Sequence, residues 1–168
     1  MKRFLLVTLL LAGCLAGCAA QETFETIADE WEVPIQAVAK EISLKYPEDA
    51  SLLTGSSDAG GAVYFCEDYT FSLQVLPSGD LDKTLREVTG FGREDLTVME
   101  TEQSTVQATT ARYDWVWSCA GEAGDQVCRG AILDDGNFHY VLTAMVPEEK
   151  AKDVEAGWDR MFQSFWVA

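Results

Sequence analysis

Histidine is almost absent from this sequence, since His139 is the only one among 168 residues. Most designs that activate a serine, threonine or cysteine nucleophile need a histidine as the base. His139 lies in a run with the alternation of a β-strand, and no serine or cysteine elbow motif accompanies it. We therefore expect a packed structural histidine and a protein that is not an enzyme.

Basic residues are also scarce, because 12 Lys and Arg stand against 28 Asp and Glu, which gives a net charge of −16. A surface of this sign repels nucleic-acid phosphates and anionic lipid headgroups, so we expect no nucleic-acid partner. Its ordinary use is solubility, as on many secreted proteins, and it attracts cations and basic partners.

No apolar run reaches the ~20 residues that a membrane-spanning helix needs. The run at residues 4–11 follows Lys2 and Arg3 and precedes small residues, which is the layout of a secretory signal peptide. It continues into Leu-Ala-Gly-Cys twice, ending at Cys14 and at Cys18, and each copy resembles the bacterial lipobox. Cys18 is the preferred lipidation site because cleavage at Cys14 would leave a very short signal. Cys14 and an ordinary secreted protein remain alternatives.

Lipidation at Cys18 divides the chain into a signal peptide at 1–17, a polar tether at 18–39 and one globular domain at 40–168. Removal of the signal takes away two basic residues and no acid, so the net charge falls from −16 to −18. A diacylglycerol thioether and an amino-terminal acyl chain supply the two or more chains that stable anchoring requires. The expected location is the extracytoplasmic side of the cell membrane.

Hydrophobic periodicity predicts an α+β domain with an antiparallel sheet of about six to seven strands and helices on both faces. Asp80 is the expected N-cap of a helix that Gly90 ends, and Pro147 is expected in the first turn of a final helix. The expected strands are 41–46, a hairpin of 62–66 and 69–76, and a meander across 96–146.

The meander's two turns suggest a register. Centring Gly-Glu-Ala-Gly-Asp on its Ala-Gly step places Cys119 opposite Cys128, and the Asp-Asp-Gly-Asn turn pairs Leu133 with Phe138. Alternation then sorts two apolar faces, both of which need a cover. One face carries Val116, Val127, Ala131, Leu133, Phe138, Tyr140, Leu142 and Ala144, and the other carries Tyr113, Trp115, Trp117, Ile132, Val141 and the two cysteines.

Once Cys18 carries lipid, the remaining thiols are Cys66, Cys119 and Cys128. The preferred interpretation is a Cys119–Cys128 disulfide that leaves Cys66 as a free thiol, and reduced thiols are the alternative. A zinc site from these cysteines and His139 lacks the CxxC and HxxxH spacings of such sites. We expect no metal and no cofactor.

The order of elements resembles the PsbP-like α/β/α sandwich across residues 40–167. The resemblance is carried by the strand Tyr140-Val141-Leu142-Thr143 and by the following helix, which ends in Ser164-Phe165. It implies a non-catalytic role in binding or assembly.

Anchor, charge and resemblance together predict a membrane-anchored protein-binding or assembly module with an unknown protein partner. The alternative is a module that binds a small ligand or a cation, through the face of Trp115 and Trp117 or through acidic loops.

Overall fold

The computed structural model describes residues 37–53, 61–104, 109–121 and 124–167. The chain divides into two units, Met1–Ala37 and Val38–Ala168, and the following concerns the second unit. Cys14, Cys18 and nearly all of the predicted tether lie outside the described residues.

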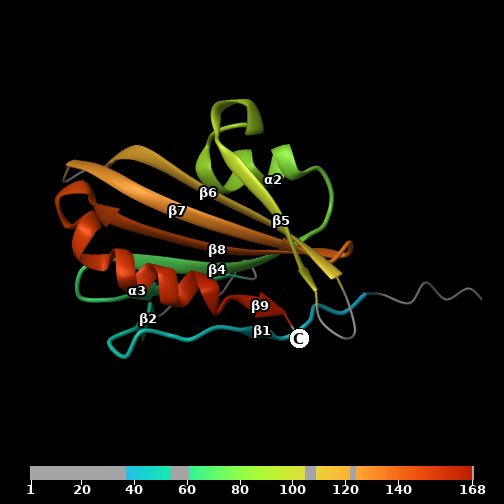
Figure 1. Ribbon diagram of the computed structural model, residues 1–168, viewed down its shortest axis with the longest axis horizontal. Helices are drawn as coiled ribbons and strands as arrows, with labels where there is room; N and C mark the ends of the chain where they lie inside the picture. Colours follow the sequence, from blue (N-terminus) through green and yellow to red (C-terminus); the bar gives the residue numbers. More distant parts are fainter. Residues whose placement is uncertain (1–36, 54–60, 105–108, 122–123, 168) are drawn as a thin grey trace, which may run out of the picture. The chain divides into compact units, whose positions relative to one another are not determined.

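A seven-stranded antiparallel sheet forms the body of the domain, in the order β2-β3-β4-β8-β7-β6-β5 (Figure 1). The order of the strands and their alternation confirm the predicted α+β fold. The strands of this sheet are β2 (Ser51–Leu52), β3 (Gly61–Phe65), β4 (Thr70–Pro77), β5 (Val98–Ser104), β6 (Thr109–Gly121), β7 (Gly124–Asp134) and β8 (Phe138–Pro147).

One helix covers each face of the sheet. The predicted helix α2 (Leu81–Thr89) begins at Asp80, whose carboxylate accepts a hydrogen bond from the Asp82 N–H, and ends at Gly90 with a φ of 82°. Gly90 has no Cβ, so this left-handed conformation costs it little. The other helix is α3 (Ala151–Gln163), and the two short 3-10 helices are η2 (Arg93–Asp95) and η3 (Glu148–Lys150).

The prediction that Pro147 opens the last helix is wrong, because Pro147 ends β8 and η3 separates it from α3. The predicted strand 41–46 is shorter than expected: only β1 (Ile42–Ser43) forms, and it pairs with β9 (Trp166–Val167) outside the main sheet. A chain segment near each end of the domain is thereby tied to the other.

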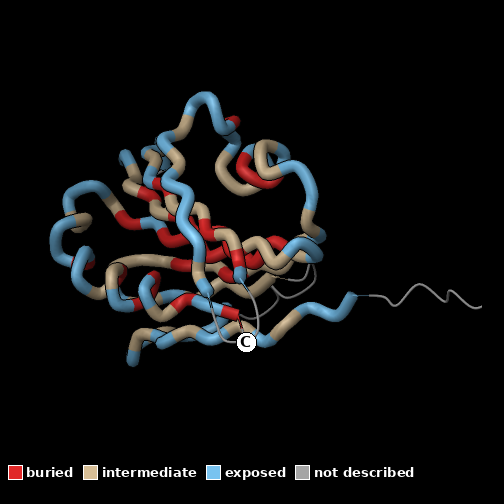
Figure 2. The backbone as a smooth tube through the Cα atoms, turned by 45° about the vertical axis from the view of Figure 1, so that its right-hand side comes forward, coloured by how far each residue is buried: buried red, intermediate tan, exposed pale blue. Residues whose placement is uncertain are grey.

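Each face of the sheet has its own core. Under α3 lie the buried side chains of Phe71, Leu73, Ala131, Leu133, Tyr140, Leu142, Ala144, Val146, Val154, Trp158, Met161, Phe162, Phe165 and Val167. Between α2 and the sheet lie the side chains of Leu85, Trp115, Ile132 and Val141, of which Leu85 belongs to α2 itself. This is the sorting that alternation predicts, and Figure 2 shows the buried segments gathered along the central strands.

The predicted register of the meander is wrong by two positions. Cys128 lies opposite Trp117, Cys119 lies opposite Gln126, and Leu133 lies opposite Tyr140. A shift of two leaves every side chain on its predicted face because the side-chain period of a strand is two. The two faces were therefore predicted correctly although the cross-strand partners were not.

Candidate functional site

A groove of about 870 Å³ lies between α3 and the outer strands of the sheet. We call it the α3–β5 groove. Its lining combines apolar, charged and amide side chains. The lining residues are Thr97, Met99, Gln103, Arg112, Asp114, Trp115, Val116, Val127, Arg129, Ala151, Lys152, Glu155, Trp158, Asp159 and Gln163.

The groove exists because the core under α3 is built on β4, β7 and β8, and no residue of β5 or β6 belongs to it. Val116 is on the predicted face, yet its side chain is 59% exposed, so the prediction that it is covered is wrong. Met99 of the edge strand is 62% exposed beside it. Exposed apolar side chains within a concavity mark a binding surface more often than isolated ones do.

Arg112 forms one wall of the groove and fixes the end of α3. Its guanidinium donates two hydrogen bonds, of 2.6 and 2.8 Å, to the two carboxylate oxygens of Asp114. It also donates to the backbone carbonyls of Phe162 and Phe165, at 3.0 and 3.2 Å. Carbonyls at a helix C-terminus have no partner within the helix, and a cation there also complements the helix dipole.

Arg129 forms a second clamp on the same helix. Its guanidinium lies 4.5 Å from the centre of the Phe162 ring and donates to Asp159 at 2.6 Å. Sequence reasoning assigned no role to Arg112 or Arg129. One feature of the sequence could have identified them. Each is a basic residue at a strand position that alternation assigns to a buried face, whereas most charged residues fall on positions assigned to solvent.

The side chains that line the groove are mainly apolar, amide and ion-paired. Among the described residues that line it, none is a histidine, cysteine or serine. Two of its three carboxylates, Asp114 and Asp159, are held in ion pairs with arginine. These two carboxylates therefore hold arginine side chains in place along the groove.

The face of Trp115 and Trp117 is mostly core. Trp115 is 1% exposed and its ring packs directly on Gly130, where an added Cβ would come within 2.2 Å of it. Trp117 is half-buried and stacks on Trp115, with ring centres 6.1 Å apart. Only Trp117 is left to contact a ligand on this face, so a two-tryptophan stacking platform does not form.

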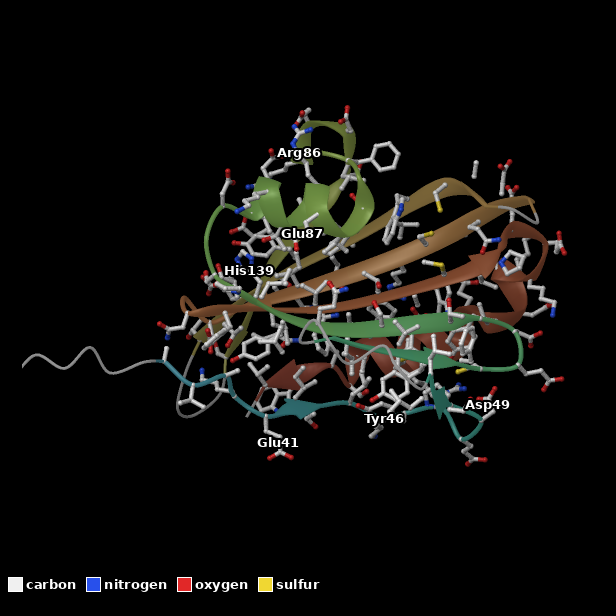
Figure 3. The ribbon with its side chains drawn as sticks, turned by 180° about the vertical axis from the view of Figure 1, so that it is seen from behind. Glu41, Tyr46, Asp49, Arg86, Glu87 and His139 are labelled. Atoms are coloured by element: carbon white, nitrogen blue, oxygen red, sulfur yellow. The ribbon has the colours of Figure 1, made fainter. Side chains whose placement is uncertain are left out.

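His139 is fully buried where the sheet passes beneath α2 (Figure 3). Its Nδ1 is 2.8 Å from the hydroxyl of Thr84, and its Nε2 is 3.5 Å from the Asp134 carboxylate, too long for a hydrogen bond. Threonine, histidine and aspartate are the residue types of a catalytic triad, but Thr84 is only 6% exposed and His139 is fully buried. The network joins α2 to the sheet, as the structural interpretation of His139 predicts.

Cys119 and Cys128 are diagonal neighbours on β6 and β7, with their sulfurs 3.6 Å apart as free thiols. Burial and the neighbouring Cys119 thiol raise the pKa of Cys128 to about 12. The predicted disulfide stays a prediction, although the two cysteines are not the directly opposed pair that the predicted register implies. Burial also raises the pKa of Cys66, with nearby Asp49 adding to the shift.

The acidic loop at residues 134–137 forms a turn. Asp134 and Asp135 accept backbone N–H groups of residues 136–138, and Gly136 has a φ of 87°, so the predicted turn is confirmed. Across the part of the chain that the structure describes, no three His, Cys, Asp or Glu side chains are grouped to hold a metal ion. The four residues weighed for zinc, Cys66, Cys119, Cys128 and His139, do not converge.

Comparison with known proteins supports the fold and leaves the family open. The chain matches no protein-family model and no curated protein. A cyanobacterial PsbP from Synechocystis, CyanoP, is similar in structure with a TM-score of 0.51 and 14% identity, over 82% of this chain and 96% of that one. The domain therefore has a PsbP-like α+β fold, as the resemblance in sequence implies.

Two further solved structures are similar at lower scores. LpqN, involved in cell envelope biogenesis of Mycobacterium tuberculosis, has a TM-score of 0.49 and 16% identity over 77% of this chain and 84% of that one. A protein from Bacteroides thetaiotaomicron has a TM-score of 0.48 and 14% identity over 76% of this chain. The aligned part spans 45% of that longer protein. Within the described residues, no helix has the length and apolar character to cross a membrane.

Proposed function

We propose that this chain is an extracytoplasmic lipoprotein, anchored through Cys18, whose domain binds a partner protein in the α3–β5 groove without catalysing a reaction. The α3–β5 groove is the observation that carries the proposal. Its volume of about 870 Å³ lies within the range of concave sites that bind small ligands, and it can hold several side chains of a protein segment. A protein segment suits it because the groove includes residues of the edge strand β5 and so extends to the border of the sheet.

The walls of the groove are preorganised for binding. Arg112 and Arg129 are already paired with carboxylates and clamp α3, so their side chains need not be ordered when a ligand arrives. Fixed side chains reduce the entropy cost of association. The exposed Val116 and Met99 then supply apolar surface that a partner can cover.

Site-specific photo-crosslinking tests the proposal in intact membranes. A benzophenone amino acid replaces Val116 in the full-length protein, and a matched variant carries it at Met145, which is 42% exposed on the opposite face. We expect a discrete adduct with one partner from position 116 and none from position 145. Mass spectrometry then identifies the partner.

Affinity for the purified partner provides the second readout. We expect Val116→Glu to weaken binding at least tenfold, which corresponds to about 1.4 kcal/mol. Met145→Glu should leave the affinity within twofold. Equal adducts from both positions, or unchanged affinity for Val116→Glu, would show that the groove is not the binding site.

A further inference from the structure

Strand β5 has an outer edge that no other described strand pairs with. It is the last strand in the sheet order and pairs only with β6 among the strands of the described residues. Its four central residues, 99–102, are all exposed, and Figure 2 shows this strand as a largely exposed segment. Folded proteins usually block such an edge with a proline, a bulge or charged side chains, most often lysine. The charged residues of β5 are Glu100 and Glu102, which disfavour pairing with an acidic strand and leave the edge open to a basic one. The sequence of β5, Val-Met-Glu-Thr-Glu-Gln-Ser, contains no proline or lysine, and its pairing with β6 runs without a bulge.

The two faces of β5 differ in chemistry. Met99 and Gln103 lie on the groove side, and both are part of the groove lining. Glu100 and Glu102 point to the opposite side, because they pair with Tyr113 and Ala111 on the α2 face of β6. Arg93 contacts Glu100 at 3.4 Å in an exposed pair, which contributes little, and Glu102 forms no ion pair with any described residue.

A second copy of the chain fits this edge poorly. Antiparallel self-pairing centred on Thr101 would set Glu100 of each copy directly opposite Glu102 of the other. Like charges at directly opposed positions destabilise a strand pair. Each copy also carries a net charge of −16, which opposes association further.

We propose that β5 accepts an extended segment of the partner protein as an eighth strand, and that this segment alternates basic with apolar residues. The inference rests on the proposed protein-binding function and names the chemistry of its ligand. Main-chain hydrogen bonds to the outer edge of β5 hold the segment. Its Lys or Arg side chains face Glu100 and Glu102, and its apolar side chains lie against Met99 at the groove.

A synthetic peptide provides the probe. An eight-residue peptide alternating lysine and valine, acetylated and amidated at its ends, carries a fluorescent label for anisotropy. The protein is the mature lipidated chain in detergent. We expect saturable binding, and we expect slower hydrogen exchange of backbone amides within residues 98–104 when the peptide is bound. A peptide methylated on alternate backbone nitrogens should lose at least tenfold in affinity.

Charge reversal tests the two glutamates. Glu100→Lys with Glu102→Lys should weaken binding at least tenfold, and a glutamate–valine peptide should bind this variant better than the native protein. The matched control is Glu148→Lys with Glu149→Lys, which makes the same change in net charge at two exposed residues of η3. It should change the affinity less than twofold.

Three results would overturn the inference. The first is an equal loss of peptide affinity in the two charge-reversed proteins. The second is peptide binding that does not slow hydrogen exchange within residues 98–104. The third is a dimer, seen in sedimentation, that forms through β5 and prevents the peptide from binding. Crosslinking from position 116 separates the two proposals: if it succeeds while β5 stays unprotected, the groove binds its partner in another way. If it fails, the proposed function itself is wrong.

Discussion

At the scale of single residues, Gly130 shows how tightly the core under α2 is packed. A Cβ at this position would lie 2.2 Å from the Trp115 ring, which is fully buried and has no room to retreat. We expect Gly130→Ala to lower the free energy of unfolding by about 1–3 kcal/mol, the usual cost of overpacking. Urea denaturation followed by tryptophan fluorescence measures it.

Gly157 provides the control for this substitution. It lies within α3, and no atom comes within 4 Å of a Cβ added there. Gly157→Ala should therefore raise the stability by about 0.5–1 kcal/mol, because alanine is the better helix former. If both substitutions shift the free energy of unfolding in the same direction, the close contact between Gly130 and Trp115 does not determine the effect of Gly130→Ala.

Asp135 couples stability to pH. Burial acts to raise the pKa of its carboxyl, but hydrogen bonds from Phe138 and Asn137, from the Tyr140 hydroxyl and from Lys40 outweigh burial and hold that pKa below its ordinary 3.8. A carboxyl whose pKa is lower in the folded than in the unfolded protein stabilises the fold at pH values above its pKa in the unfolded chain. This contribution is lost as the pH falls through its pKa in the folded protein.

The substitution Asp135→Asn isolates this effect. The turn bonds to one oxygen can persist, while the ion pair with Lys40 is lost, so we expect about 1–3 kcal/mol less stability at pH 7. The stability of the variant should fall less than that of the native protein when the pH drops below about 4. Asp125→Asn, at an exposed position of β7, is the control and should change neither quantity. Parallel pH profiles for Asp135→Asn and native protein would refute the coupling.

At the scale of elements, the seating of α3 depends on Arg112. Arg112→Met removes the donors to the Phe162 and Phe165 carbonyls and leaves Asp114 unpaired in a largely buried position. We expect a loss of about 3–5 kcal/mol in the free energy of unfolding, as for other broken buried ion pairs. Hydrogen exchange within 151–163 should accelerate more than exchange in β3 and β4.

Adding Asp114→Leu to Arg112→Met removes the unpaired carboxylate. The double variant should recover part of the lost stability, because much of the loss comes from the buried charge that is left behind. Its α3 should still exchange faster than in the native protein, since the hydrogen bonds from the guanidinium to the Phe162 and Phe165 carbonyls are still missing. A double variant as unstable as the single one would assign the whole effect to the helix clamp.

The elements themselves were largely predictable from local chemistry. Asp80 and Gly90 delimit α2 because capping depends on a few neighbouring residues. The register of the meander was not predictable in this way. The first hairpin pairs Gly121 with Gly124, so its turn is centred one residue earlier than the predicted Ala-Gly step. Each face was still predictable, since a shift of two positions preserves it.

The groove could not be predicted from sequence for a different reason. Its walls depend on contacts between distant segments, such as Arg112 with carbonyls 50 and 53 residues further along the chain. Alternation places Val116 on the face of α3, but it carries no information on how far α3 extends across the sheet. The length and position of one helix therefore decide whether an apolar strand residue is buried in the core or exposed in the groove.

At the scale of the whole molecule, the groove differs from the rest of the surface. Its lining carries Arg112, Arg129 and Lys152 against three carboxylates, so the site is balanced while the chain carries −16. For the basic partner that we propose, long-range attraction would come from the surrounding acidic surface, and close contact from apolar and main-chain groups. Association rates should consequently fall with ionic strength more than dissociation rates rise.

The same charge makes the lipid anchor testable. A mature chain of charge −18 is repelled by anionic headgroups, so nothing in its charge retains it at a membrane without acyl chains. We expect Cys18→Ser to move the protein from the detergent-rich to the aqueous phase on Triton X-114 partitioning. Cys14→Ser should stay in the detergent phase, because residue 14 is removed with the signal peptide. Mass spectrometry of the mature amino terminus gives the direct readout, and lipid on Cys14, or an unlipidated terminus, would contradict the assignment.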